Sequence, residues 1–363
     1  MEKETLILEH LKANPFISQQ QLAEKVNLSR SSVANYIGSL TAQGKIKGRA
    51  YIFPKEKVIT CIGGANVDRK AQTKEAIRYH SSNPVTMSES FGGVARNVAE
   101  NLAALGHEVS FLSIVGNDKE GQAILEDTKG LGIDVQLTEV VPGGRTGTYT
   151  ALLDLSGEMA VSLANMDIYD QLTPEVVERK WSQVAGSQAI FLDTNAPAGT
   201  LAYIVRRCAE DGLTLFIDPV SSLKSRKLPQ DLTGVTVLLP NLEEAEELAG
   251  MKIETSADYS KVAEIIRARG VNSVVITLGE AGIFYATSDG SGQMLPYPVE
   301  IVDVTGAGDA LTAGILSGIV QGQPLKEACK YGLAAAAFAL ATEQSASPDL
   351  SFEKITAWIK EHE

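Results

Sequence analysis

The chain has 363 residues, 44% hydrophobic and 21% charged, a composition typical of globular proteins with one large and one small domain. Its net charge of −13 is uneven, because residues 1–57 carry nine Lys/Arg and five Glu, a net +4, which leaves −17 on the rest. Only the N-terminal segment therefore favours nucleic acid. The sequence shows neither a signal-peptide pattern nor an apolar run of ~18 residues, so we expect a cytoplasmic protein.

The first 54 residues show helical patterns followed by a basic alternating stretch. Ser18 precedes the helical segment Gln19–Val26 as an N-cap, and Ser29 opens a second helix that Gly44 ends. Residues 45–53 alternate like a small hairpin. We predict a winged helix-turn-helix domain over residues 1–54 and a linker over residues 55–57. A helical domain that serves only dimerisation is the alternative.

The helix-turn-helix prediction implies duplex DNA as a partner. The residues that would meet the major groove open the second helix, and basic residues of the hairpin would contact phosphates. The groove-facing set is Ser29, Arg30, Ser31, Ser32 and Asn35, and the phosphate-facing set is Lys45, Lys47 and Arg49.

Residues 58–105 predict a strand, a small-residue turn and a helix. The strand 58–62 leads through Gly63-Gly64-Ala65 to Asn66 and Asp68, and a second turn, Gly92-Gly93, precedes Asn97. Because α/β folds bind ligands at the carboxyl ends of strands, we expect these polar side chains to meet a hydroxyl-rich substrate. Taken singly, each of these turns is equally compatible with an ordinary cap.

A strand–turn–strand pattern occupies residues 146–164, centred on Ser156-Gly157. A hairpin between α/β units is unusual and fits a lid that closes over a substrate. A surface hairpin is the alternative.

The second half alternates strands and helices. Strands are predicted at 189–192, 213–217, 235–239 and 273–277, which favours a parallel sheet with helices on both faces. Polar residues follow these strands, among them Asn195, Asn241 and Glu244. Glu244 would hold a magnesium-bound water beside phosphates, unless the acidic run from Glu243 to Glu247 is only a solvated helix face.

The segment Asp303-Val304-Thr305-Gly306-Ala307-Gly308-Asp309-Ala310 lies between a strand-like stretch, 299–302, and a predicted helix, 311–318. Glycines allow the backbone to approach a ligand, and the N–H groups at the helix start attract anions. A carboxylate there suits proton removal from a hydroxyl, so we predict phosphoryl transfer with Asp309 as base. An ordinary glycine-rich turn is the alternative. The absence of GxxxxGK[ST], of GxGxxG and of GxSxG disfavours P-loop ATPases, dinucleotide dehydrogenases and α/β-hydrolases.

Residues 92–97, Gly-Gly-Val-Ala-Arg-Asn, and residues 303–310 resemble the two signatures of ribokinase-like (PfkB-type) sugar and nucleoside kinases, and the likeness covers about residues 58–350. The resemblance implies an α/β kinase domain over 58–363, with a parallel central sheet and a small β lid mainly from 68–90 and 146–168. It also implies ATP, Mg²⁺ and K⁺ as cofactors.

The resemblance assigns roles to residues. Asp309 would be the catalytic base, and Gly306, Ala307 and Gly308 the anion hole. Substrate contacts are implied for Asn66, Asp68, Gly92, Gly93, Asn97, Asn165, Asn195 and Asp309. Nucleotide contacts are implied for Asn241, Thr277, Gly279, Gly282, Gly306 and Gly308. Glu244 would hold Mg²⁺ through water, and Asp303 and Thr305 would hold a monovalent cation.

Within this family, the pattern is most similar to pseudouridine kinases, through pieces such as 82–84, 157–159, 165–168 and 347–351. The likeness implies transfer of phosphate from ATP to the 5′-hydroxyl of a nucleoside, with pseudouridine the best match. We also expect a homodimer. Another acceptor, such as inosine, ribose or a phosphosugar, stays open. So does a transcription regulator whose kinase fold only senses its ligand.

Overall fold

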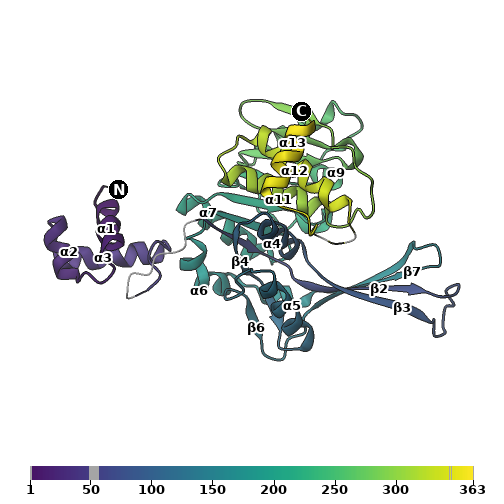
Figure 1. Ribbon diagram of the computed structural model, residues 1–363, viewed down its shortest axis with the longest axis horizontal. Helices are drawn as coiled ribbons and strands as arrows, with labels where there is room; N and C mark the ends of the chain where they lie inside the picture. Colours follow the sequence, from purple (N-terminus) through teal and green to yellow (C-terminus); the bar gives the residue numbers. More distant parts are fainter. Residues whose placement is uncertain (1, 49–56, 343, 345, 363) are drawn as a thin grey trace.

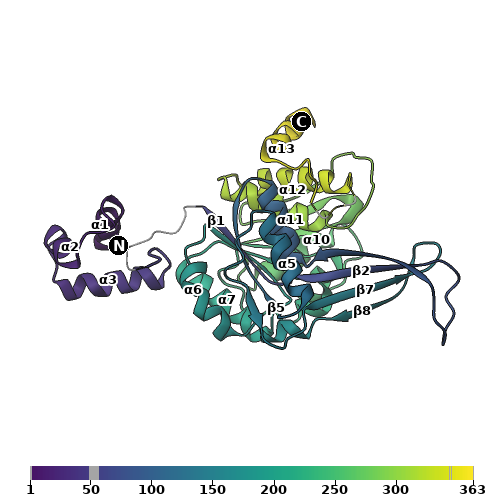
Figure 2. The same ribbon diagram turned by 60° about the horizontal axis from the view of Figure 1, so that its bottom comes forward.

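The computed structural model describes residues 2–48, 57–342, 344 and 346–362. It shows a small helical unit at one end, an α/β body in the middle and a group of strands projecting from the other end (Figures 1 and 2). The N-terminal unit and the projecting strands thus lie on opposite sides of the body.

The N-terminal unit contains three helices, α1 (Glu2–Ala13), α2 (Gln19–Val26) and α3 (Arg30–Ala42). As predicted, Ser18 caps α2, in a capping box with Gln21, and Ser29 caps α3 by accepting a hydrogen bond from the Ser32 N–H. The helices share a core that includes Ile7, Leu11, Leu22, Val33 and Leu40. The predicted hairpin, 45–53, falls largely outside the described residues, and residues 45–48 form no strand.

The body is organised around an eight-stranded sheet, in the order β14 (Ser291–Met294), β13 (Ile283–Ala286), β12 (Ser273–Thr277), β11 (Val237–Leu238), β10 (Leu215–Asp218), β9 (Ala189–Asp193), β1 (Val58–Ile62) and β4 (Glu108–Leu112). The six strands from β12 to β4 are parallel. At one edge of the sheet, β13 pairs in antiparallel fashion with both β12 and β14. The sheet is therefore mixed rather than wholly parallel. Five residues separate β12 from β13, too few for the crossover that a parallel neighbour requires.

Helices cover both faces of this sheet, as the sequence predicts. One face packs against α6 (Pro174–Val184), α7 (Ala198–Asp211), α9 (Leu242–Ala249) and α10 (Asp258–Arg267), and the other against α4 (Val94–Ala104), α11 (Ala307–Val320) and α12 (Leu325–Leu340). Helix α13 (Phe352–His362) packs against α12. Successive side chains divide between the two cores, since Ile190 of β9 joins the first and Phe191 the second. Among the described residues, no helix combines the length and apolar character needed to cross a membrane.

Four strands form a separate sheet, in the order β3 (Val85–Gly92), β2 (Asn66–Thr73), β7 (Gly147–Leu153) and β8 (Met159–Asn165). Two antiparallel hairpins, β2–β3 and β7–β8, join through a parallel β2–β7 pair. This four-stranded sheet projects from the body in both views (Figures 1 and 2). A third pair, β5 (Ile114–Gly116) and β6 (Glu139–Val141), and helix α5 (Lys119–Gly130) complete this side of the body.

The N-terminal unit contacts the body through Gly44, which follows α3. Gly44 has φ 72°, and a Cβ atom there would collide with the Ser182 carbonyl oxygen at the end of α6 and lie 2.5 Å from the Gly186 nitrogen. A side chain at this position would therefore force the two parts of the chain apart.

One predicted strand is wrong. Residues 299–302 form no strand, and the Val302 N–H instead donates to the Leu340 carbonyl oxygen at the end of α12, 2.8 Å away. Ile301 and Val302 are exposed, so the apolar residues there do not mark a buried strand. The predicted helix over 311–318 is longer at both ends, since α11 begins at Ala307 and ends at Val320.

Helices α11 and α12 pack closely through glycines, so a larger residue at such a position should destabilise the fold. A Cβ atom at Gly314 would lie 2.5 Å from the Tyr331 carbonyl oxygen and 2.7 Å from the Gly332 Cα atom. We expect Gly314→Ala to lower the free energy of unfolding by about 1–3 kcal/mol, because the helices must separate. Gly199 in α7 has open space around it, so Gly199→Ala is the matched control. Equal melting temperatures for the two variants would contradict this packing argument.

Candidate active site

The glycine-rich turn before α11 forms a cradle at the start of that helix. Gly306 is the N-cap residue, with φ 79° in the left-handed region that favours glycine, and α11 begins at Ala307. A Cβ atom at Gly308 would meet nothing within 4 Å, so the backbone faces open space there. First-turn N–H groups lack partners within their own helix and attract anions. The cradle therefore suits a phosphate group.

Asp309 lies in the first turn of α11, beside this cradle. Its Oδ2 atom accepts a hydrogen bond of 2.8 Å from Asn97 Nδ2, on the first turn of α4. Burial raises the pKa of Asp309 to about 7; the Asn97 hydrogen bond lowers the pKa, whereas nearby Asp193 and Asp68 raise it further. A carboxyl group that titrates near neutrality can accept a proton from a hydroxyl group.

Asp68 and Asn66 bring polar atoms from β2 to the same region. Asn66 Nδ2 donates to Asp68 Oδ1 at 2.6 Å, and burial raises the pKa of Asp68 to about 6. Gly92 lies opposite, on β3, where a Cβ atom would collide with the Asp68 carboxylate. Glycine is thus required for Asp68 to take this position. Gly93, with φ 106°, similarly allows α4 to approach the Gly64 carbonyl oxygen.

Asp193 is a central residue that sequence reasoning missed. It is fully buried at the end of β9, and its Oδ2 atom accepts hydrogen bonds from the N–H groups of Gly64 and Ala95, at 2.8 and 3.1 Å. It also accepts from the N–H and side-chain amide of Asn195. The sequence signal was a polar residue at the end of a strand. Asn195 carries the same signal, and the prediction assigned the substrate contact to Asn195 instead of Asp193.

A second group that the sequence analysis passed over follows β10. Burial raises the pKa of Asp218 well above its usual range, and the charges of Glu244 and Asp309 add to the effect. Lys224 of the short helix α8 (Ser222–Ser225) donates to Asn195 Oδ1 at 2.6 Å. These residues extend the polar cluster along the ends of neighbouring strands.

Asn241 and Glu244 form a capping box at the start of α9. Glu244 Oε2 accepts from the Asn241 N–H and Oε1 from Asn241 Nδ2, both at 2.9 Å. Burial raises the pKa of Glu244. No group of three metal-ligating side chains occurs in the part of the chain that the structure describes. With both carboxylate oxygens already accepting hydrogen bonds, Glu244 fits the predicted contact with Mg²⁺ through water better than direct coordination.

The predicted nucleotide residues lie near one another after β11 and β12. Asn241 and Thr277 form a parallel bridge, and the Thr277 N–H donates to the Pro240 carbonyl oxygen. Gly279 and Gly282 flank η2 (Gly279–Ala281), both with positive φ. A Cβ atom at Gly282 would collide with the Met294 carbonyl oxygen, so packing against β14 explains this glycine.

Two predicted residues precede the cradle, and one lies on the projecting sheet. Asp303 Oδ1 accepts a hydrogen bond of 2.8 Å from the Thr305 N–H, which lowers the pKa of Asp303. An ionised carboxylate fits a monovalent cation there, and that role stays a prediction. Asn165 is exposed on β8, paired with Thr148, and its substrate contact also stays a prediction.

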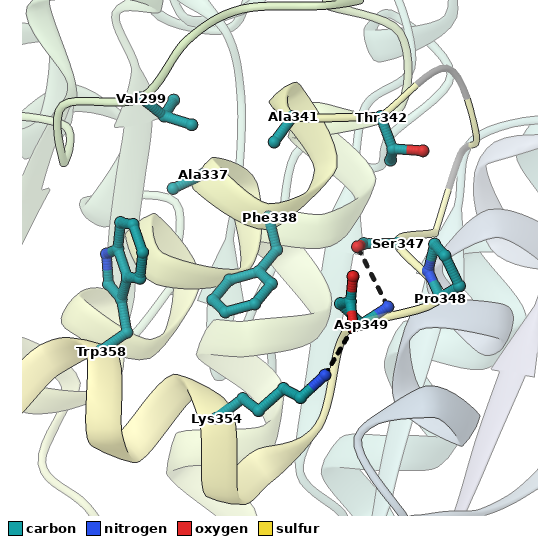
Figure 3. Close-up of a pocket in the computed structure, with 10 residues that line it drawn as sticks. All are labelled: Val299, Ala337, Phe338, Ala341, Thr342, Ser347, Pro348, Asp349, Lys354 and Trp358. Carbon is teal, nitrogen blue, oxygen red and sulfur yellow. Dashed lines mark hydrogen bonds and ion pairs between the residues drawn. The ribbon is translucent and has the colours of Figure 1, made fainter.

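A cleft borders this region, and a separate cavity lies between two C-terminal helices. A cleft of about 560 Å³ joins residues predicted to bind the substrate and the monovalent cation to the projecting sheet, with a lining that includes Asp68, Gly92, Asn97, Thr305, Lys70 and Tyr149. A second cavity, of about 350 Å³, lies between α12 and α13, where Figure 3 shows the rings of Phe338 and Trp358 and the Lys354–Asp349 ion pair. The first cleft brings together residues from both predicted signatures.

Residues 56–351 match the family described as pfkB family carbohydrate kinase. The chain belongs to this family. It is therefore an ATP-dependent kinase of the sugar and nucleoside class. Residues 2–47 match a second family, described as winged helix-turn-helix DNA-binding.

Individual proteins resemble this kinase over most of its length. A pseudouridine kinase of Escherichia coli (strain K12) is 35% identical over 306 residues, 84% of this chain and 97% of that protein. The uncharacterized sugar kinase YeiI of the same organism is 30% identical over 359 residues, 99% of this chain and 98% of its own. A carbohydrate kinase from Agrobacterium tumefaciens has a solved structure with a TM-score of 0.72 and 28% identity, covering 84% and 97% of the two chains.

The shifted pKa values predict opposite stability changes for Asp309, in the first turn of α11, and Asp303, in the loop before it. The pKa of Asp309 is raised on folding, so its ionisation destabilises the fold as pH rises from about 4 to about 7. Asp309→Asn should therefore gain stability over the parent protein across that range and keep the gain above it. Thermal unfolding at several pH values measures the difference.

Asp303→Asn is the matched control, because the pKa of Asp303 is lowered. Its carboxylate stabilises the fold above its unfolded pKa of about 4, and this contribution disappears at lower pH. We expect this variant to lose stability at neutral pH and to match the parent protein in acid. The same sign for both variants at pH 8 would contradict the pKa assignments.

Proposed function

We propose that this kinase transfers the γ-phosphoryl group of ATP to the 5′-hydroxyl of a nucleoside, with pseudouridine as the best match. The observation that carries the proposal is the position of the Asp309 carboxyl group, between the glycine cradle and the polar end of β2. The similarity to the pseudouridine kinase of Escherichia coli supports the choice of acceptor.

The proposed chemistry divides between backbone and side chains. The amides of residues 306–308 would stabilise the phosphoryl group in flight, while the bond to the departing ADP breaks and a bond to the acceptor oxygen forms. Asp309 would take the hydroxyl proton, and its pKa of about 7 suits that transfer. Asn97 positions the Asp309 carboxylate through their hydrogen bond.

The remaining residues would hold the two substrates. Glu244, with Asn241, would hold Mg²⁺ through water, which neutralises phosphate charge when bound, and Asp303 and Thr305 would hold K⁺. The nucleotide would also meet Thr277, Gly279 and Gly282. The acceptor would meet polar atoms and glycine backbone of the first signature and of the strand ends: Asn66, Asp68, Gly92, Gly93, Asn97, Asn165 and Asn195.

The projecting sheet, formed mainly by residues 68–90 and 146–168, would act as a lid over the substrate. Its side chains Lys70 and Tyr149 already line the cleft that contains Asp68 and Asn97. Closure would exclude water and so limit hydrolysis of ATP.

Exposed apolar side chains on the edge strand β8 support the predicted homodimer: Met159, Val161 and Leu163. Measurement of the molar mass in solution would test this oligomeric state.

A second candidate function is DNA binding by residues 1–54. The kinase domain, residues 58–363, would then either phosphorylate its substrate or only sense its ligand. The match of residues 2–47 to a DNA-binding family supports it. Arg30, Ser31 and Asn35 are exposed on α3, as a groove-reading helix requires, while Ser29 and Ser32 bond to each other within the cap. Lys45 and Lys47 are exposed nearby, and Arg49 lies outside the described residues.

An acceptor screen tests the kinase proposal. We expect ATP consumption to be fastest with pseudouridine in a panel that includes uridine, inosine and ribose, and the product to carry phosphate on its 5′-oxygen. Asp309→Asn should lower kcat by roughly 10²–10⁴-fold, because proton removal is lost. Asp289→Asn, in an exposed turn, is the control. Fast turnover of ribose without turnover of pseudouridine would discard the nucleoside assignment, and no turnover of any acceptor would favour the sensor.

A binding experiment tests the DNA proposal. The full chain should bind duplex DNA from a random-sequence pool, with an affinity that falls more than tenfold between about 50 and 200 mM salt, because phosphate contacts release counterions. Arg30→Ala should weaken binding, whereas Lys25→Ala on α2 should have a smaller effect. Binding without salt dependence, or none at all, would refute the proposed role of these charges.

A further inference from the structure

Three of the side chains that line the cleft beside the cradle are basic: Arg69, Lys70 and Arg96. Arg69 lies on β2 and is already neutralised by two carboxylates. Its Nε atom donates to Glu89 Oε2 at 2.8 Å, and its Nη2 atom donates to Glu120 Oε1 at 3.0 Å. Because Glu89 lies on β3 and Glu120 on α5, Arg69 joins the projecting sheet to the body and has a structural role.

Arg96 is also engaged by groups of the fold. It is buried at the start of α4, where its guanidinium group donates to Glu100 Oε2 at 3.1 Å, to the Asp127 carboxylate and to the Phe91 carbonyl oxygen at 3.2 Å. Lys70 differs from both arginines, because within the described part of the chain its ammonium group forms neither a hydrogen bond nor an ion pair. Its three N–H donors therefore stay available to a ligand or to water.

The strand register places Lys70 beside uncharged neighbours. Lys70 and Asp68 are two residues apart on β2, so their side chains point to the same face of the projecting sheet. Across the sheet, Lys70 is paired with Ser88 of β3 and with Ala151 of β7, which also lines the cleft. The sheet therefore presents the Lys70 ammonium group to the cleft with no carboxylate opposite it on either neighbouring strand.

The charge of Lys70 acts on carboxylates on two sides of the cleft. Burial raises the pKa of Asp68 to about 6, and the charge of Lys70 opposes this rise. Hydrogen bonds from Thr305 lower the pKa of Asp303, and the charge of Lys70 lowers it further. Asp303 and Thr305 precede the glycine cradle, and Thr305 lines the same cleft. The ammonium group thus faces the space between the polar end of β2 and the cradle.

We propose that Lys70 is a catalytic residue whose ammonium group contacts the phosphoryl group as it passes from ATP to the acceptor. The inference rests on the proposed phosphoryl transfer at the cradle and deepens it. The bond between the γ-phosphorus and the ADP oxygen breaks, and a bond from the same phosphorus to the acceptor oxygen forms. The hydroxyl proton goes to Asp309, and Lys70 keeps its own protons throughout.

A full positive charge adds what the cradle lacks. The phosphoryl group in transfer spreads negative charge over three oxygen atoms, each of which can accept a hydrogen bond. The backbone amides of residues 306–308 donate hydrogen bonds but carry no net charge, and Asp68, Asp303 and Asp309 surround the same space with carboxyl groups. An ammonium group with all its donors available offsets this negative charge where the group moves.

Steady-state kinetics of the full chain test this role, with pseudouridine as acceptor or with whichever compound of the acceptor screen the parent enzyme phosphorylates fastest. Lys70→Met should lower kcat roughly 10²-fold, because the positive charge acts on the transition state. The KM values for ATP and for the acceptor should stay within about threefold of the parent values. Lys70→Arg, which keeps the charge, should restore much of the lost kcat. Lys74→Met, at an exposed position just beyond β2, is the matched control and should leave kcat unchanged.

Two further measurements separate this role from a structural one. Because Lys70 is exposed, Lys70→Met should melt within about 2 °C of the parent protein. Aluminium fluoride mimics a phosphoryl group in transfer. In the presence of ADP, Mg²⁺ and the acceptor, it should bind at least about tenfold more weakly to this variant, while ADP alone binds equally to both proteins. Isothermal titration calorimetry measures both affinities.

Each outcome decides the assignment. A loss of kcat in Lys70→Met that Lys70→Arg restores and that Lys74→Met lacks supports it. An unchanged kcat or an equal loss in both methionine variants overturns it while leaving the kinase proposal intact. A rise only in the KM for a phosphorylated acceptor also overturns it, because Lys70 would then bind a phosphate already on the acceptor. A parent enzyme that phosphorylates no acceptor overturns the proposed function, and the role of Lys70 with it.

Discussion

The site depends on one buried carboxylate, that of Asp193, and on the hydrogen bonds that it accepts. These bonds bring together the turn after β1, the start of α4 and the residues after β9. Gly63 and Gly64 have to be glycines, because a Cβ atom on either would press against Asp193 or Asn195. The polar side chains at the strand ends can take their positions only because this connection satisfies the backbone N–H groups around them.

Burial at this connection, together with neighbouring carboxylates, explains the titration of the proposed base. Burial raises the pKa values of Asp68 and Asp309 to about 6 and about 7, and the charges of Asp193 and Asp68 raise the pKa of Asp309 further. An isolated surface aspartate would be a much weaker base. The carboxylates around this connection favour cations nearby, which is consistent with Lys224 beside Asn195 and with the magnesium site that we propose near Glu244.

The parts of the site that could be predicted are those in which the signal is local. A cap residue, a glycine pair or a carboxylate after a strand lies within a few residues of its structural effect, as at Ser18, Ser29 and Asn241. Asp193 and Lys224 could not be assigned from sequence, because their partners lie far away in the chain or across a turn whose geometry no pattern announces. The strand predicted over 299–302 failed for the same reason: the partner of its backbone is the distant end of α12, and Ile301 and Val302 are exposed.

The small contact between the two parts of the chain limits how they influence each other. The N-terminal helices bury their own core, and Gly44 meets the body at the end of α6. This helix follows β8 and η1 (Asp167–Gln171), so one continuous stretch leads from the projecting sheet to the N-terminal unit. Because the described residues 2–48 have a core separate from those of the kinase, a ligand of the kinase would act on them through this stretch or through the connecting residues 49–57.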